Sequence, residues 1–155
     1  MSKRIALETI ELSVDDRGAG VPIVFVHGFP LNHTMWSKQI DALSGTMRTI
    51  APDLRGFGGS TVVPGTTTMA QFADDLAGML DAMRISEPIV LCGLSMGGYI
   101  AWEFVRRHRE RLRSLILCDT RAAPDTREAA QERLKTAEEV VCLGEEKNKE
   151  TKKPK

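Results

Sequence analysis

The sequence predicts an α/β fold built on a doubly wound, mostly parallel sheet. Apolar runs typical of strands alternate with helix-like segments from Val21 onward, which is the pattern of parallel strands joined by crossover helices. One run, Val21–Val26, is almost continuously apolar, as expected of a strand covered on both faces. Polar or glycine-rich segments follow these runs directly, at the sheet edge where such folds hold their sites. The 155 residues suffice for one domain of this kind.

The chain opens with two short segments of partial alternation, Ile5–Leu7 and Ile10–Val14. Alternating apolar and polar residues indicate strands with one covered face, so we expect an antiparallel start to the sheet. The cluster Asp15–Gly20 is rich in turn-forming residues and predicts a turn. This turn would lead into the first parallel strand, Val21–Val26.

The middle of the chain predicts a helix over Thr34–Leu43, a strand over Met47–Ala51 and a second helix over Met69–Met83. Thr68 and Gln71 have the spacing of a capping box, which satisfies free amides at a helix start. The second helix has one apolar stripe at helical spacing: Met69, Phe72, Ala73, Leu76, Leu80 and Met83. This stripe predicts that one face of the helix packs against the sheet.

The segment Gly93-Leu94-Ser95-Met96-Gly97 follows the predicted strand Ile89–Leu91 after Cys92 and precedes a helix-like segment. A serine on a sharp strand-to-helix turn brings the two backbones together two residues before it and two residues after it. Gly93 and Gly97 occupy those two places, and neither carries a Cβ atom that would clash. We therefore predict a nucleophile elbow that exposes the Ser95 hydroxyl beside the Met96 N–H.

A helix over Met96–His108 and a strand over Arg113–Cys118 complete the predicted core, with Asp119 at the carboxyl end of that strand. No further strand follows in the sequence, so Arg113–Cys118 is expected to form a bare sheet edge. Exposed apolar edges pair readily with other chains. We therefore expect self-association through residues 113–118.

The predicted organisation has three parts. Residues 1–124 form the core, which lacks the last strands of a complete sheet. Residues 125–144 begin a helix with a thin apolar stripe, capped by Asp125 and Glu128. Residues 145–155 are charged, contain no apolar residue and are expected to be disordered.

Composition excludes several classes of protein. The chain is 42% hydrophobic and 27% charged with a formal net charge of zero, so nothing points to nucleic acid or to an anionic membrane surface. No apolar run has the length of a membrane span or of a signal peptide. Three cysteines without metal-ligand spacing favour a reducing cytoplasm, and we expect neither a metal nor a cofactor.

Three motifs together resemble the α/β-hydrolase fold superfamily. They are His27-Gly28-Phe29-Pro30, Asp53-Leu54-Arg55-Gly56-Phe57-Gly58-Gly59-Ser60 and Gly93-Leu94-Ser95-Met96-Gly97-Gly98, in this order. The resemblance covers nearly all of Ile5 to Asp119 and is nearest to small esterases, enol-lactonases and cofactor-free haloperoxidase-like members. It implies the α/β-hydrolase type of sheet. One fold hosts many chemistries, so it does not choose among these activities.

The resemblance implies a role for several positions. Ser95 matches the nucleophile, and the backbone N–H groups of Phe29 and Met96 match the two donors of the oxyanion hole. His27 matches a histidine that orients the oxyanion loop, with substrate contact as the alternative. Asp53 is expected to fix the glycine-rich loop through local hydrogen bonds. That loop lacks the lysine ending of a phosphate-binding P-loop, so nucleotide binding is not expected.

The sequence departs from the family at the catalytic histidine, which members carry on later strands. His108 lies thirteen residues beyond Ser95 on one predicted helix, or roughly 20 Å away. His33 could line the mouth of the pocket or be a solvated loop residue. Asp119 matches the triad acid of some relatives, with a turn-capping or pocket-lining carboxylate as the alternative. A serine without a base is a poor nucleophile.

Two functions follow from these residues. The first is a serine hydrolase that acts on a small carboxylic ester or lactone through a Ser95 acyl-enzyme, with an incomplete chain that lacks its histidine. The second is a catalytically inactive remnant or small-molecule binding module that keeps the elbow and the pocket floor. The missing base separates the two hypotheses.

Overall fold

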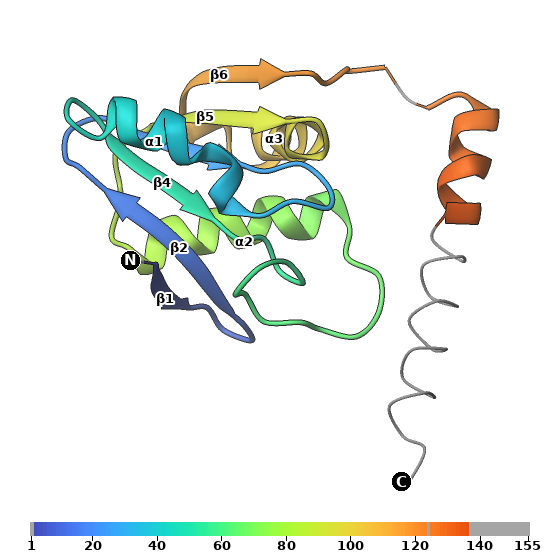
Figure 1. Ribbon diagram of the computed structural model, residues 1–155, viewed down its shortest axis with the longest axis horizontal. Coiled ribbons are helices and arrows are strands. Elements are labelled where there is room, and N and C mark those ends of the chain that lie inside the picture. The colour runs from blue at the N-terminus through green and yellow to red at the C-terminus, as the bar shows by residue number, and fades with distance from the viewer. Residues whose placement is uncertain (1, 124, 137–155) are drawn as a thin grey trace, which may run out of the picture. The chain divides into compact units, whose positions relative to one another are not determined.

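The computed structural model describes residues 2–123 and 125–136, and its core is a six-stranded sheet (Figure 1). The order of the strands across the sheet is β1-β2-β4-β3-β5-β6. The strands are β1 (Lys3–Ala6), β2 (Glu11–Arg17), β3 (Pro22–Val26), β4 (Arg48–Pro52), β5 (Ile89–Leu94) and β6 (Leu112–Cys118). The helices of the core are α1 (Ser37–Leu43), α2 (Met69–Ala82) and α3 (Met96–Arg107), with the 3-10 turns η1 (His33–Trp36) and η2 (Arg109–Arg111).

The pairing of the strands confirms the predicted α/β sheet. β1 pairs with β2, and β2 with β4, in antiparallel fashion. β4, β3, β5 and β6 are joined to one another by parallel pairings. The carboxyl ends of these four strands therefore meet at one edge of the sheet, where the motifs of the sequence follow them.

Both faces of the sheet are covered, which explains the continuous apolar run in β3. Val24 and Val26 point into a core cluster with α2 and α3, whereas Ile23 and Phe25 point into a second cluster on the other face. Trp36 and Ile40, from η1 and α1, close that second cluster. Because successive strand residues alternate between faces, a strand between two layers needs apolar residues at every position.

β2 is longer than the sequence predicts. The turn expected over residues 15–20 was wrong at its start, since β2 continues through Arg17. Asp15 accepts hydrogen bonds from the Arg17 guanidinium at 2.6 and 2.8 Å, and Asp16 accepts two from Arg48 of β4 at 2.9 and 3.0 Å. Burial of Asp16 favours its neutral form, yet the bonds from Arg48 hold its pKa below the ordinary value. Arginine partners thus allow two carboxylates on a strand that their local sequence disfavours.

The predicted helices are present with small differences. α2 begins after Thr68, whose hydroxyl oxygen accepts a hydrogen bond from the Gln71 N–H at 3.1 Å. Only this half of the predicted capping box forms, because the Gln71 side chain lies 3.4 Å from the carboxylate of Asp75 instead. The helix predicted over Thr34–Leu43 divides into the 3-10 turn η1 and α1.

The chain divides into two compact units, Met1–Ala122 and Ala123–Lys155. Residues 137–144 of the predicted C-terminal helix lie outside the described residues, and so does the tail predicted to be disordered, 145–155. Within the described ranges, no helix combines the length and the apolar character needed to cross a membrane.

In the second unit, residues 127–136 are helical, and Thr126 caps this helix. Its hydroxyl oxygen accepts a hydrogen bond from the Ala129 N–H at 3.2 Å, and its carbonyl oxygen accepts one from Ala130 at 2.9 Å. The prediction that Asp125 provides the cap was wrong by one residue. Asp125 forms an ion pair with Arg133 along the helix instead, at 2.6 Å. Thr126 has the spacing that lets a side-chain oxygen reach the third helical N–H.

Candidate active site

Ser95 occupies the turn between β5 and α3, as the sequence predicts. Its backbone has φ 50° and ψ −110°, outside the regions that residues with a Cβ atom ordinarily adopt. α3 begins at the next residue, Met96, and the Ser95 side chain lies at the surface. A strained and exposed serine at the amino end of a helix is a feature typical of functional sites.

Gly93 and Gly97 allow the close approach that this turn requires. A Cβ atom on Gly93 would overlap the carbonyl group of Gly97 and lie 2.9 Å from the Gly98 nitrogen. A Cβ atom on Gly97 would overlap the carbonyl oxygen of Val26, in the neighbouring strand β3. The steric reason for the glycine spacing is therefore confirmed, and every atom in these contacts belongs to the backbone.

The turn is also braced from β6. The Ser95 N–H donates to the Cys118 carbonyl oxygen at 3.0 Å. The Ser95 carbonyl oxygen accepts from the Gly98 N–H at 2.9 Å and from the Thr120 hydroxyl at 2.9 Å. These hydrogen bonds offset part of the strain at Ser95. They fix both peptide groups of Ser95.

The loop that follows β3 places the Phe29 peptide beside Ser95. A Cβ atom built on Gly28 would lie 3.5 Å from the Ser95 Cβ atom. The Gly28 carbonyl oxygen accepts two hydrogen bonds, from His27 Nδ1 and from the Leu31 N–H, both at 2.9 Å. The Phe29 N–H belongs to the same planar peptide and points the opposite way from that carbonyl. Fixing the carbonyl therefore also fixes the direction of the Phe29 N–H.

His27 is fully buried, and both nitrogens of its ring form hydrogen bonds. Nε2 accepts from the Leu54 N–H at 3.1 Å, so the proton is on Nδ1, which donates to Gly28. Burial lowers the pKa of His27 below its ordinary value. The ring is therefore neutral and in one tautomer, and it joins the loop that follows β3 to the end of β4.

His33 pairs with Asp53, which is also buried. One carboxylate oxygen of Asp53 accepts from His33 Nδ1 at 2.6 Å and from the His33 N–H at 2.8 Å, and the other accepts from the Gly59 N–H at 2.8 Å. Burial favours the neutral carboxyl, but the hydrogen bonds from His33 and Gly59 hold the pKa of Asp53 below its ordinary value. Asp53 thus connects the loop that follows β3 with the glycine-rich loop.

The remaining candidates lie in different places. His108 follows α3, and its Nε2 lies 2.8 Å from a carboxylate oxygen of Asp74 in α2. Asp119 is exposed and lies one residue beyond the carbonyl that binds the Ser95 amide. The structure therefore brings Ser95, Phe29 and Met96 to one edge of the sheet, and Asp119 directly follows β6, whose last carbonyl binds the Ser95 amide.

Sequence reasoning missed the partner of Asp53 and the contribution of Thr120. Asp53 and His33 both follow parallel strands at the same sheet edge, and this shared position was the only signal that could have linked them. Thr120 carries no motif, because its hydroxyl binds a backbone carbonyl that only the folded turn brings near.

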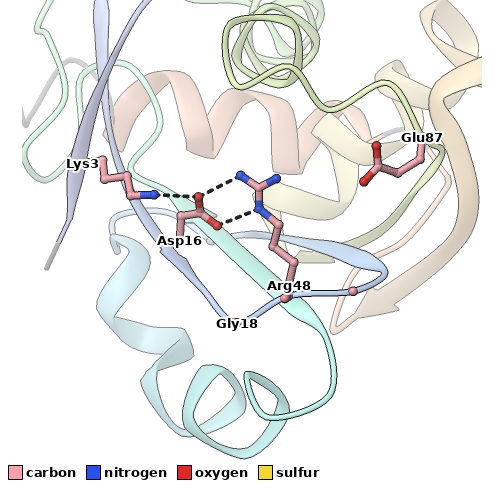
Figure 2. Close-up of a pocket in the computed structure, with 7 residues that line it drawn as sticks. Lys3, Asp16, Gly18, Arg48 and Glu87 are labelled. Carbon is pink, nitrogen blue, oxygen red and sulfur yellow. Dashed lines mark hydrogen bonds and ion pairs between the residues drawn. The ribbon is translucent and has the colours of Figure 1, made fainter.

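A hollow of about 440 Å³ lies at the opposite, amino end of the parallel strands. Figure 2 shows Lys3 and Arg48 both directed at Asp16, with Glu87 facing Arg48 and Gly18 on the adjoining loop. The Asp16 carboxylate binds Lys3 at 3.1 Å and Arg48 at 2.9 Å, and hydrogen bonding to Asp16 raises the pKa of Arg48. These ion pairs fasten β1, β2 and β4 together, at the far end of the strands from Ser95.

The residues that the structure describes contain no cluster of three or more histidine, cysteine, aspartate or glutamate side chains placed to hold a metal ion. Within the described ranges, Cys92 and Cys118 form no disulfide. Burial, and then the nearby Cys118 thiol, raises the pKa of Cys92 to about 12. Cys92 therefore acts as a small buried core residue beneath the elbow.

This mostly parallel sheet, with an exposed serine on the strained turn between β5 and α3, has the architecture of the α/β class of hydrolase folds. The family model described as alpha/beta hydrolase fold matches residues 21–140. The chain belongs to this family.

Solved and curated relatives cover several activities. A solved thermophilic esterase from Thermogutta terrifontis, with malate bound, is 50% identical with a TM-score of 0.85, over 90% of this chain and 53% of that one. The non-heme chloroperoxidase CPO-A1 of Kitasatospora aureofaciens is 40% identical over 70% of this chain and 40% of its own length. An epoxide hydrolase of Caballeronia sordidicola is 37% identical over 72% and 35%, respectively. The chain thus spans about half, or less, of the length of these relatives.

Proposed function

We propose that the protein is a serine hydrolase that cleaves a small carboxylic ester or lactone through a Ser95 acyl-enzyme. One observation carries the proposal: Ser95 lies exposed on a strained turn directly beside the fixed Gly28–Phe29 peptide. The similarity to a solved esterase, at 50% identity, supports an acyl substrate. A serine hydroxyl suits attack on a carbonyl carbon.

In the proposed reaction, the Ser95 Oγ atom forms a bond to the carbonyl carbon, and negative charge moves to the carbonyl oxygen. The N–H groups of Phe29 and Met96 would stabilise this oxygen. Preorganised donors of this kind contribute about 2.7–4 kcal/mol each, because they need no reorganisation when charge develops. The tetrahedral intermediate then expels the alcohol and leaves the acyl group on Ser95.

The proton of Ser95 needs an acceptor. All three histidines of the sequence are described, and none of them forms a hydrogen bond with Ser95. Both ring nitrogens of His27 are bound, to Gly28 and Leu54, while Nδ1 of His33 binds Asp53 and Nε2 of His108 binds Asp74. We therefore propose that a histidine outside this sequence takes the proton. Asp119, one residue beyond β6, remains a candidate for orienting it.

The positions of the three histidines also favour a second candidate function. With no described histidine bound to Ser95, the elbow and the two amide donors could bind an acyl compound without turning it over. The protein would then be a small-molecule binding module of the hydrolase fold.

Reaction with p-nitrophenyl acetate distinguishes these functions, with Ser95→Ala as the control. The serine hydrolase requires a burst or turnover of p-nitrophenol that Ser95→Ala abolishes, together with an acetyl group on the Ser95 peptide by mass spectrometry. Equal release by both proteins would exclude catalysis by this chain alone and leave the binding module.

A further inference from the structure

We infer that Asp53 is a positioning residue for the oxyanion hole, and that it acts through His33 on the direction of the Phe29 N–H. The inference rests on the proposed function of Ser95. It concerns residues that do not touch the substrate in this proposal but that determine where the Phe29 donor points.

The oxyanion loop, residues 27–33, is bound at both ends to the consecutive residues Asp53 and Leu54. At its start, His27 Nε2 accepts from the Leu54 N–H at 3.1 Å. At its end, His33 donates twice to Asp53, from its N–H at 2.8 Å and from Nδ1 at 2.6 Å. Asp53 and Leu54 directly follow β4, so the end of one buried strand determines the span of the whole loop.

The effect on Phe29 follows from the chain between these two anchors. His33 lies two residues after Leu31, whose N–H donates to the Gly28 carbonyl oxygen at 2.9 Å. That carbonyl and the Phe29 N–H share one rigid peptide plane. If His33 leaves Asp53, Leu31 loses its fixed position, and the Gly28 carbonyl keeps only its bond from His27 Nδ1, so the peptide that carries the donor is held less firmly.

The Asp53 carboxylate suits this task because it is buried and accepts only. It is 2% exposed, and its two oxygens accept three hydrogen bonds, from two donors of His33 and from the Gly59 N–H. Hydrogen bonds to an ionised acceptor are stronger and shorter than neutral ones. Asparagine in its place would turn an NH₂ group toward one of these N–H donors, which removes at least one bond.

The chain contains a matched control. His108 Nε2 lies 2.8 Å from the Asp74 carboxylate, which gives a second histidine–carboxylate pair. This pair joins the end of α3 to α2 rather than the loop beside Ser95. His108→Ala therefore removes an equivalent interaction without changing the anchors of the oxyanion loop.

The first test measures hydrogen exchange of the Leu31 amide in the full chain, in His33→Ala, Asp53→Asn and His108→Ala. We expect exchange at least about tenfold faster in His33→Ala than in the parent, because the charge-assisted hydrogen bond from the His33 ring is lost and only the one from the backbone N–H remains, and unchanged exchange in His108→Ala. His33→Gln, whose amide can still donate to Asp53, should restore most of the protection. If Asp53→Asn fails to fold, the comparison of His33→Ala with His33→Gln still tests whether the His33–Asp53 bond protects the Leu31 amide. Equal Leu31 exchange in His33→Ala and His108→Ala would overturn the inference.

The second test measures Ser95 acylation by p-nitrophenyl acetate. His33→Ala should lower the acylation rate constant at saturating ester about tenfold or more and leave the KM nearly unchanged, since the donor acts on developing charge. Faster Leu31 exchange with an unchanged acylation rate would contradict the link to Phe29. Equal rates for the parent and Ser95→Ala would instead exclude catalysis by this chain alone, and the Leu31 exchange would still decide the positioning of the loop.

Discussion

The same substitution, glycine to alanine, should have opposite effects at Gly97 and Gly78. Both residues lie in helices, in α3 and α2 respectively, where alanine is intrinsically favoured by about 1 kcal/mol. At Gly78, the new Cβ atom would lie 3.7 Å from a Leu7 methyl group, an ordinary van der Waals contact. We therefore expect Gly78→Ala to raise the free energy of unfolding by about 0.5–1 kcal/mol.

At Gly97, the new Cβ atom would overlap the Val26 carbonyl oxygen and lie 2.9 Å from the Val26 carbonyl carbon and 3.0 Å from the His27 carbonyl oxygen. Overpacking typically costs about 1–3 kcal/mol. The cost here belongs at the upper end of that range, because the atoms met are backbone atoms of a central strand that cannot rotate away. It exceeds the gain in helix propensity, so Gly97→Ala should lower the free energy of unfolding by about 1–2 kcal/mol.

Urea unfolding of the two variants and of Gly45→Ala measures these effects. A Cβ atom on Gly45 would meet nothing within 4 Å, so this variant should stay within about 0.5 kcal/mol of the parent. Gly97→Ala should also slow any Ser95 acylation, because the helix start that carries the Met96 N–H must shift. If Gly97→Ala proved as stable as Gly45→Ala, the close approach of α3 and β3 at the elbow would be refuted.

Three further predictions concern protonation, the sheet edge and a buried ion pair. Because burial lowers the pKa of His27, the unfolded chain binds more protons, so stability should be full above about pH 6.5 and fall as the pH drops below it; urea midpoints should show this slope, and His27→Gln should remove it. Ile116 is 43% exposed on the edge strand β6, so we propose that copies of this chain associate there; light scattering should show oligomers that Ile116→Lys reduces, whereas a concentration-independent monomer would contradict this. Asp75 is buried and accepts two hydrogen bonds of 2.6 Å from Arg55, so Asp75→Asn should lower the free energy of unfolding by about 3–5 kcal/mol. Asp81→Asn, at an exposed ion pair, should lower it by about 0–1 kcal/mol. Equal losses of the two variants in thermal or urea unfolding would count against a buried pair.

The sequence predicts those parts of the fold that depend on neighbouring residues. The apolar run in β3, the stripe of α2 and the glycines around Ser95 are all short-range patterns, and the structure contains each of them. The extent of β2 could not be predicted in this way. Asp15 and Asp16 resemble turn residues until Arg48, on the neighbouring strand, provides the charge that lets Asp16 be buried.

The candidate site also contains residues that local sequence predicts and residues that it does not. Ser95, Phe29 and Met96 are recognisable because each is defined by its place in a local motif. The Asp53–His33 pair is not, because the two residues are twenty positions apart and meet only where β3 and β4 end together. Its geometry also depends on the Gly59 N–H, which the glycine-rich loop returns to the carboxylate.

The strain at Ser95 shows why local and distant contacts are both needed. The glycine spacing removes clashes, but the absence of a clash does not by itself hold a serine at φ 50°. The Ser95 amide is held by the Cys118 carbonyl, and the Ser95 carbonyl by Gly98 and Thr120, so β6 and the residues just after it help to keep the turn strained. β6 is also the exposed edge of the sheet in the described residues. A chain that paired with this edge would therefore contact the same strand that holds the Ser95 turn, so the association that we propose at β6 would act on the geometry of Ser95.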